Sequence, residues 1–269
     1  MDDLLVVDSA TALDASARGR VVVCGSHGAL YPAWLAAQAG VRAIIMNDAG
    51  IGRHSAGVAG LAWLGGLGIA ACAIDHRTGR IGDAADMLEH GLVSMANDVA
   101  AGLGCLPGHT ARQAAAALLE DAVAPDGAPV PEIGVTRLRI ANSGHREVWA
   151  LDSAALARES DRRAILVTGS HGGLLGGRED DGVLAVDAFA ALLNDAGGGK
   201  DDAGFARLPV LDARGIAAAT VSCQTARIGD GRSSYDTGVL SRVNEVARRL
   251  DLKEGMSARE AVARLVGLG

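Results

Sequence analysis

The stretch RVVVCGSHG at 20–28 recurs as AILVTGSHG at 164–172, and in both places an apolar run ends in Gly-Ser-His-Gly. The match extends in both directions along the chain. Three further pairs of similar segments occur in the same order in both halves. One pair precedes the quoted stretches: LLVVDSATALDASARG (4–19) with VWALDSAALARESDRR (148–163). Two pairs come after them: NDAG (47–50) with NDAG (194–197), and GIAACAIDHRTGRIGDA (68–84) with GIAAATVSCQTARIGDG (215–231). Between GSHG and NDAG the second copy is three residues longer. Ordered self-similarity of this length predicts an internal duplication.

The duplication predicts the organisation of the chain. We expect one α/β unit at 1–121, a connection at 122–147 that holds three of the six prolines, and a second α/β unit at 148–269. Short apolar runs predict buried strands at 21–23, 42–46, 165–167 and 217–221. Alanine-rich stretches predict helices or helix ends at 187–197 and 259–267. This alternation favours mostly parallel sheets with helices on both faces, in two units related by a pseudo-twofold axis.

Composition excludes several classes of function. The chain has 269 residues, 49% of them hydrophobic, and a net charge of −7. The sequence contains no run of basic residues, so we expect neither nucleic acid nor an anionic membrane surface as a partner. The acidic start MDDLLVVDSA does not resemble an export signal, and the four cysteines lack CxxC spacing, so we expect free thiols and a cytoplasmic location. Residues 55–74 carry no charge, but their charged counterpart in the second copy argues against a membrane span.

Polar residues follow the predicted strands at the edge where parallel sheets bind ligands. His27 and His171 end the GSHG strands, where they could carry protons; the alternative is a structural turn in which Ser and His cap the next helix. Asp48 and Asp195 of NDAG could cap helices, orient a histidine or hold a ligand. The site candidates of this edge also include Ser170, Asn47 and Asn194. No His-x-His or HExxH spacing is present, so we expect no metal.

The two copies differ in chemistry after the fourth strand. Copy one reads Asp75-His76-Arg77-Thr78, and copy two reads Ser222-Cys223-Gln224-Thr225, while Arg80 and Arg227 match in the residues that follow. A structural turn gains little from this exchange, whereas a site shared by two related halves can use it. We therefore expect Cys223 to be accessible, with its thiolate fraction raised by a nearby histidine. The alternative is an inert loop residue.

The pieces AILVTGSHGG (164–173) and AAATVSCQTA (217–226) resemble the caspase-hemoglobinase class of cysteine peptidases, in which one strand ends in His-Gly and a later one in Cys. The resemblance implies His171 as general acid/base, Cys223 as nucleophile and the Gly172 N–H as an oxyanion donor.

These patterns predict a hydrolase of a small polar amide, lactam or related acyl compound. Cys223 would attack, His171 would shuttle the proton, and Arg80 or Arg227 would hold a substrate carboxylate, with Ser222 beside the nucleophile. One alternative is a cofactor-independent lyase or isomerase that uses His27, His76, His171 and Cys223 as acid–base groups. Another is a non-catalytic protein that binds a metabolite. No GxGxxG or Walker sequence is present, so we expect a small-molecule substrate and no cofactor. A homo-oligomer is a common state for α/β proteins of this size.

Overall fold

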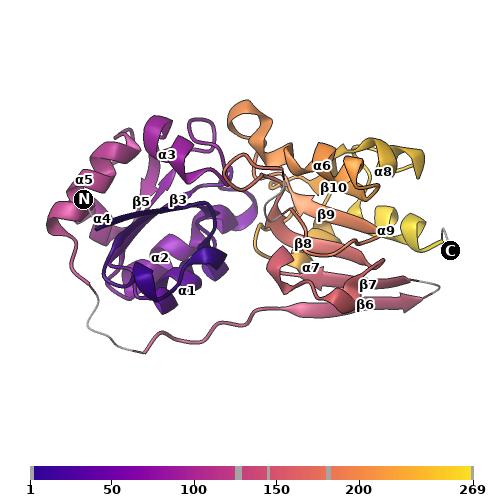
Figure 1. The fold of residues 1–269 in the computed structure, drawn as a ribbon, viewed down its shortest axis with the longest axis horizontal. Helices are drawn as coiled ribbons and strands as arrows, with labels where there is room; N and C mark the ends of the chain where they lie inside the picture. The colour runs from indigo at the N-terminus through magenta and orange to yellow at the C-terminus, as the bar shows by residue number, and fades with distance from the viewer. Residues whose placement is uncertain (1–2, 125–128, 144–145, 180–182, 268–269) are drawn as a thin grey trace.

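Two sheets, each flanked by helices, form the two halves of the computed structural model (Figure 1). The structure describes residues 3–124, 129–143, 146–179 and 183–267. Both sheets are mostly parallel, so the predicted α/β class is confirmed. Within the described residues, no helix is long and apolar enough to cross a membrane. The uncharged stretch 55–74 instead forms a helix and the strand after it.

The first sheet has five strands in sequence order, β1-β2-β3-β4-β5. The first four pair in parallel and β5 pairs antiparallel with β4. β2 to β4 are buried along their whole length, because helices cover both faces. The strands are β1 (Leu4–Val7), β2 (Val21–His27), β3 (Ala43–Asn47), β4 (Ala70–Ile74) and β5 (Val93–Ala96).

Helices on the two faces of this sheet fill two separate cores. Alternate strand residues such as Val22 and Ile44 pack on α1 and α2, whereas Val23 and Ile45 pack on α3, α4 and α5. The helices are α1 (Leu30–Ala39), α2 (Ala59–Gly66), α3 (Ala84–His90), α4 (Asp98–Gly102) and α5 (Ala111–Asp121). Short 3₁₀ turns complete the unit: η1 (Ala10–Ala12), η2 (Ala15–Ala17) and η3 (Arg53–Val58).

The second sheet has six strands in the order β11-β10-β9-β8-β7-β6. β7 to β10 are parallel, and the two edge strands are antiparallel to their neighbours. The strands are β6 (Arg137–Ser143), β7 (Arg146–Leu151), β8 (Ile165–His171), β9 (Ala190–Asn194), β10 (Ala217–Val221) and β11 (Leu240–Val243). Around them lie η4 (Ala154–Leu156), η5 (Glu159–Asp161), η6 (Lys200–Phe205), α6 (Arg207–Ala213), α7 (Gly231–Thr237), α8 (Glu245–Arg249) and α9 (Ala258–Gly267).

The order of elements in the second half follows the first with two differences. Helix α1 has no helical counterpart among the described residues of 172–189, which run as loop between β8 and β9. The predicted connection 122–147 also contributes structure, because β6 extends the second sheet by a strand that the first sheet lacks.

One secondary-structure prediction is wrong. The stretch 187–197 was expected to be helical, but it contains the buried strand β9. Ala and Leu are strong helix formers, but intrinsic propensity is a small effect, and pairing with strands on both sides overrides it. The helix expected at 259–267 is present as α9.

The two halves meet through a small apolar cluster and pairs of matching contacts. Ala29, which α1 follows, packs there with three pairs of equivalent residues: Ala49 with Ala196, Ala56 with Ala203, and Ile81 with Ile228. The Arg53 N–H donates to the Cys223 carbonyl at 2.7 Å, and the equivalent Lys200 N–H donates to the His76 carbonyl at 2.8 Å. Each half therefore holds the strand-end loop of the other.

Candidate functional site

Two loops with unusual backbone conformations follow β3 and β9 where the halves meet. Six residues in each have positive φ: Ala49, Gly50, Ile51, Gly52, His54 and Ser55 in the first, and Ala196, Gly197, Gly198, Gly199, Asp201 and Asp202 in the second. Positive φ costs a β-branched residue such as Ile51 the most, on the order of 1–3 kcal/mol. Strain of this kind persists where the surrounding structure fixes it, and it concentrates at functional sites.

Asp48 and Asp195 organise these loops in the same way. Asp48 Oδ1 accepts from the N–H groups of Gly50 and His76, both at 3.0 Å. Asp195 Oδ1 accepts from the N–H groups of Gly197 at 3.0 Å and Cys223 at 2.9 Å. Both carboxylates are buried. Neither caps a helix; each ties the loop after its own strand to the residue that follows the next strand.

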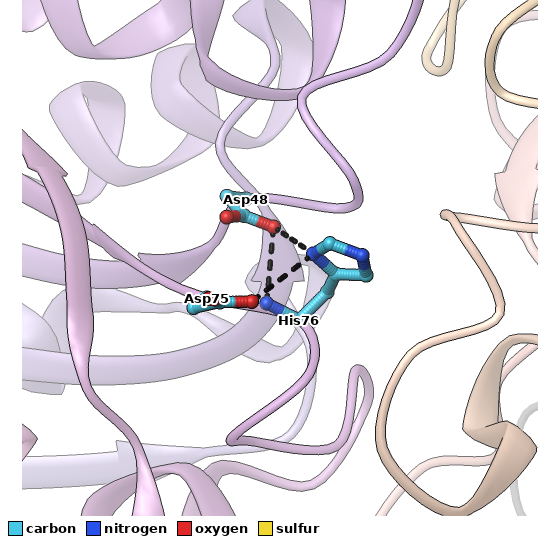
Figure 2. A group of neighbouring side chains, drawn as sticks. All are labelled: Asp48, Asp75 and His76. Atoms are coloured by element: carbon cyan, nitrogen blue, oxygen red, sulfur yellow. Dashed lines mark hydrogen bonds and ion pairs between the residues drawn. The ribbon is translucent and has the colours of Figure 1, made fainter.

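In the first half, this arrangement holds an imidazole. His76 Nδ1 donates to Asp48 Oδ1 at 2.9 Å, and Asp75 Oδ1 lies 3.4 Å from the same nitrogen. Figure 2 shows the far edge of the ring turned away from both carboxylates. Because a carboxylate only accepts, the proton of a neutral ring sits on Nδ1 and leaves a lone pair on Nε2. When neutral, His76 therefore presents an unprotonated nitrogen on the edge that faces away from both carboxylates (Figure 2).

In the second half, the same arrangement holds a thiol. Burial, reinforced by the adjacent Asp195 carboxylate and opposed by the Gln224 amide, raises the pKa of Cys223 to about 12. Gln224 Nε2 lies 3.5 Å from Sγ. The residue is only 2% exposed, and its raised pKa opposes the thiolate form that the sequence led us to expect. At neutral pH this sulfur keeps its proton.

His76 and Cys223 line one cavity of about 530 Å³ between the halves. The two loops touch at its floor: a Cβ added to Gly50 would lie 3.2 Å from Cys223 Sγ and 3.0 Å from Gly197 Cα. A Cβ added to Gly197 would lie 3.0 Å from His76 Nε2. Because Gly50 and Gly197 lack a Cβ, the Cys223 thiol and the His76 ring can lie close to the point where the two loops touch. Other lining residues are Arg77, Asp195, Gly198, Gly199, Asp202, Phe205, Ser222 and Gln224.

His171 and Cys223 are not brought together. His171 lines a different cavity, of about 640 Å³, with His27, and no described contact joins either ring to Cys223. The two rings lie edge to face with centroids 6.1 Å apart. Burial lowers the pKa of His27 to about 4 and that of His171 well below its ordinary value. Cys223 therefore shares its cavity with His76 and not with His171.

Several other predicted roles are filled by contacts within the protein. The Gly172 N–H, implied as an oxyanion donor, donates to the Asn194 carbonyl at 2.8 Å. Asn47 and Asn194 are fully buried. The amide oxygen of each accepts from an N–H of the loop after its own strand, and the amide nitrogen donates to a carbonyl after the next strand, that of Gly79 or Ala226. The Ser170 hydroxyl accepts from the Ala154 N–H at 2.8 Å and lines the larger cavity.

The two matched arginines are engaged in ion pairs within the protein. Arg80 binds Asp86 at 2.7 Å and Asp201 at 3.2 Å, and Arg227 binds Asp230 at 2.5 Å. Neither lines the cavity of His76 and Cys223. Arg77, whose side chain is largely exposed, is the arginine at its rim.

Asp48, Asp75 and His76 also form a candidate metal site. Their ligand atoms lie within 4.8 Å of one another. Asp75, however, is held by the Arg77 guanidinium through both oxygens, and Asp48 Oδ1 already accepts from three N–H groups. The hydrogen-bonded Asp–His pair accounts for the cluster.

Sequence reasoning missed Arg207, which is 4% exposed and lines the larger cavity. It aligns with Gly60 of the first copy, so the internal repeat carried no signal for it. The contact between Gly50 and Gly197 was also missed, because a repeat does not reveal how its two copies dock.

Neither a known protein family, nor a curated protein, nor a solved structure matches this chain significantly.

Proposed function

We propose that the protein is a cofactor-independent isomerase or lyase that moves a proton at a substrate carbon next to a carboxylate or carbonyl. His76 Nε2 takes the proton from carbon, and the Cys223 thiol delivers a proton from the other half of the cavity, to the substrate carbon in an isomerase or to the departing group in a lyase. The imidazolium and thiolate that result then return to their starting states by proton exchange with solvent. This balances charge and protons and needs no oxidant or cofactor.

The observation that carries the proposal is the matched pair of carboxylate-bound groups. Equivalent backbone positions hold an imidazole bound by Asp48 and a thiol beside Asp195, and both line one cavity. A general base needs a free lone pair and a general acid needs a retained proton. The Nδ1 bond of His76 supports the first role, and the raised pKa of Cys223 supports the second.

The cavity supports a small, polar substrate. Arg77 at the rim offers a cation for a carboxylate, although it is shared with Asp75. The hydrogens on a carbon beside a carboxylate or carbonyl are the ones that a neutral imidazole can remove when the developing charge is stabilised. Small 2-amino and 2-hydroxy carboxylates are therefore the first compounds to examine.

The test is hydrogen exchange at that carbon. The protein is incubated in D₂O with a panel of such carboxylates, and proton NMR follows loss of the signal from the hydrogen on carbon. We expect exchange for at least one compound, slowed about 100-fold or more in His76→Asn and in Cys223→Ala. The amide introduced by His76→Asn keeps an N–H for Asp48 but supplies no base. His109→Gln, which changes a histidine remote from the cavity, should retain the wild-type rate.

Two outcomes count against the proposal. One is the absence of exchange for every compound, and the other is exchange that survives in the folded His76→Asn protein at the wild-type rate. Thermal unfolding of each variant establishes that it is folded before its rate is compared.

A second candidate is the cysteine hydrolase, now with His76 in place of His171. It is favoured by the cavity that the two groups share and by the Gln224 amide next to the sulfur. A nucleophilic thiol, however, requires a lowered pKa, and the Asp195 carboxylate acts in the opposite direction. Acyl compounds that label Cys223 covalently at neutral pH would favour the hydrolase over the isomerase.

A further inference from the structure

The larger cavity contains a buried cation that has no counter-ion among the described residues. Arg207 is 4% exposed; its Nε donates to the Gly173 carbonyl at 2.8 Å and its Nη1 to the Val183 carbonyl at 3.2 Å. Among the residues that the structure describes, no carboxylate lies within ion-pair distance of it. Burial lowers the pKa of Arg207 to about 10. A guanidinium has five N–H donors, so three are left for another acceptor.

An unpaired buried charge costs several kcal/mol unless something compensates it. The Gly173 and Val183 carbonyls accept hydrogen bonds from the Arg207 guanidinium, but they carry no negative charge that would balance it. Such a group is therefore expected where a ligand brings the anion.

Two neutral imidazoles line the same cavity. The Gly173 N–H donates to His171 Nδ1 at 3.1 Å, so the proton of this ring is on Nε2. Gly173 also accepts from Arg207 through its carbonyl, which links the two side chains. His27 is 6% exposed, and its Nδ1 has no hydrogen-bond partner within the described structure. Buried polar atoms without partners are rare and call for an explanation.

We propose that this cavity binds a small organic carboxylate, with Arg207 as the counter-ion and His27 and His171 as hydrogen-bond partners. The site is separate from the one lined by His76 and Cys223, and the two cavities share no lining residue.

The other walls define the class of ligand. Apolar side chains of Pro32, Leu35, Leu175 and Leu184 line the cavity, which favours a ligand with an apolar part. Asp152 and Glu179 also line it, and these acids oppose a dianion such as phosphate. Arg214, the second arginine, is engaged by the Leu184 and Val186 carbonyls and by Asp187. The volume of about 640 Å³ falls in the usual range for small-molecule sites.

The test follows the imidazole Cε1–H signals of the full-length protein by NMR during titration with benzoate, acetate and inorganic phosphate. His27→Gln and His171→Gln assign the two signals. We expect saturable shifts of both with benzoate, weaker ones with acetate and none with phosphate. Arg207→Met should weaken benzoate binding at least tenfold, and Arg207→Lys, which keeps the charge, should weaken it less. Arg112→Met removes an exposed arginine and should leave binding unchanged.

The proposal is overturned if no carboxylate gives a saturable shift, if phosphate binds in preference to benzoate, or if the folded Arg207→Met protein binds benzoate like wild type. If Arg207→Met does not fold, benzoate titrations of the wild type and of Arg207→Lys decide whether Arg207 anchors the ligand. Equal benzoate affinity of these two proteins counts against an anchoring guanidinium. Cys223→Ala should bind benzoate normally, so this site can stand or fall independently of the proposed reaction.

Discussion

At the scale of single residues, burial and one carboxylate set the chemistry of the cysteine. Burial raises the pKa of the Cys223 thiol, and the Asp195 carboxylate beside it acts in the same direction. We expect alkylation of Cys223 by iodoacetamide to be slow at pH 7–8 and to increase only well above pH 9. Asp195→Asn removes the charge but keeps an oxygen for the backbone N–H groups, so the profile should move to lower pH. Mass spectrometry of the labelled peptide gives the rate.

Cys24 is the internal reference, because it is fully buried in the core and burial raises its pKa to about 11. It should stay unlabelled while the protein is folded. The unfolded thiol of Cys223 ionises near 9, so its contribution to stability is present below pH 9 and is lost as pH rises through about 12. A Cys223 that reacts at neutral pH, with no change in Asp195→Asn, would contradict this account.

At the scale of elements, glycines keep the strained loops in place. A Cβ on Gly204 in η6 would lie 1.9 Å from the Asp195 carbonyl oxygen, and one on the equivalent Gly57 would lie 2.2 Å from that of Asp48. Gly204→Ala must therefore displace the loop that carries Asp195. We expect it to lower the free energy of unfolding by about 3 kcal/mol and to abolish the proposed carbon exchange. Urea denaturation and the D₂O assay measure the two effects.

Gly66, the last residue of α2, is the matched control. It is exposed, and a Cβ there would meet nothing within 4 Å. Gly66→Ala should leave activity unchanged and raise stability by about 0.5 kcal/mol, because alanine loses less backbone entropy on folding. Equal changes in the free energy of unfolding for Gly204→Ala and Gly66→Ala would contradict this prediction, because they would mean that the contact with the Asp195 carbonyl is relieved without loss of stability.

At the scale of the whole molecule, a buried acid connects the halves. Asp86 of α3 accepts from Lys200 Nζ and Arg80 Nη2, both at 2.7 Å, and its side chain is 2% exposed. Asp86→Ala leaves two cations facing each other, so we expect a loss of about 3 kcal/mol in urea denaturation. Asp236 pairs with Arg232 and Arg259 at the surface, and Asp236→Ala should cost less than about 1 kcal/mol. Similar losses would mean that the Asp86 contacts are as well solvated as the surface ones.

The order of elements could be predicted from the local pattern. The buried strands around 21–27 and 165–171 follow from uninterrupted apolar runs rich in β-branched residues, and α9 follows from helical spacing of its apolar residues. The stretch 187–197 could not be assigned correctly in this way. Its Ala and Leu residues suit a helix, and only its place between two other strands makes it β9.

The sequence by itself determined that two similar α/β units would place polar residues at matching strand ends, with the main chemical difference at His76 and Cys223. Residue type and spacing carry that information because side-chain periodicity reflects local backbone geometry. Only the tertiary structure decided which groups share a cavity. His76, and not His171, lines the cavity of Cys223, because the loops after β3 and β9 interlock and each half supplies one group. Contacts across that interface depend on docking between segments about 150 residues apart, which local spacing does not encode.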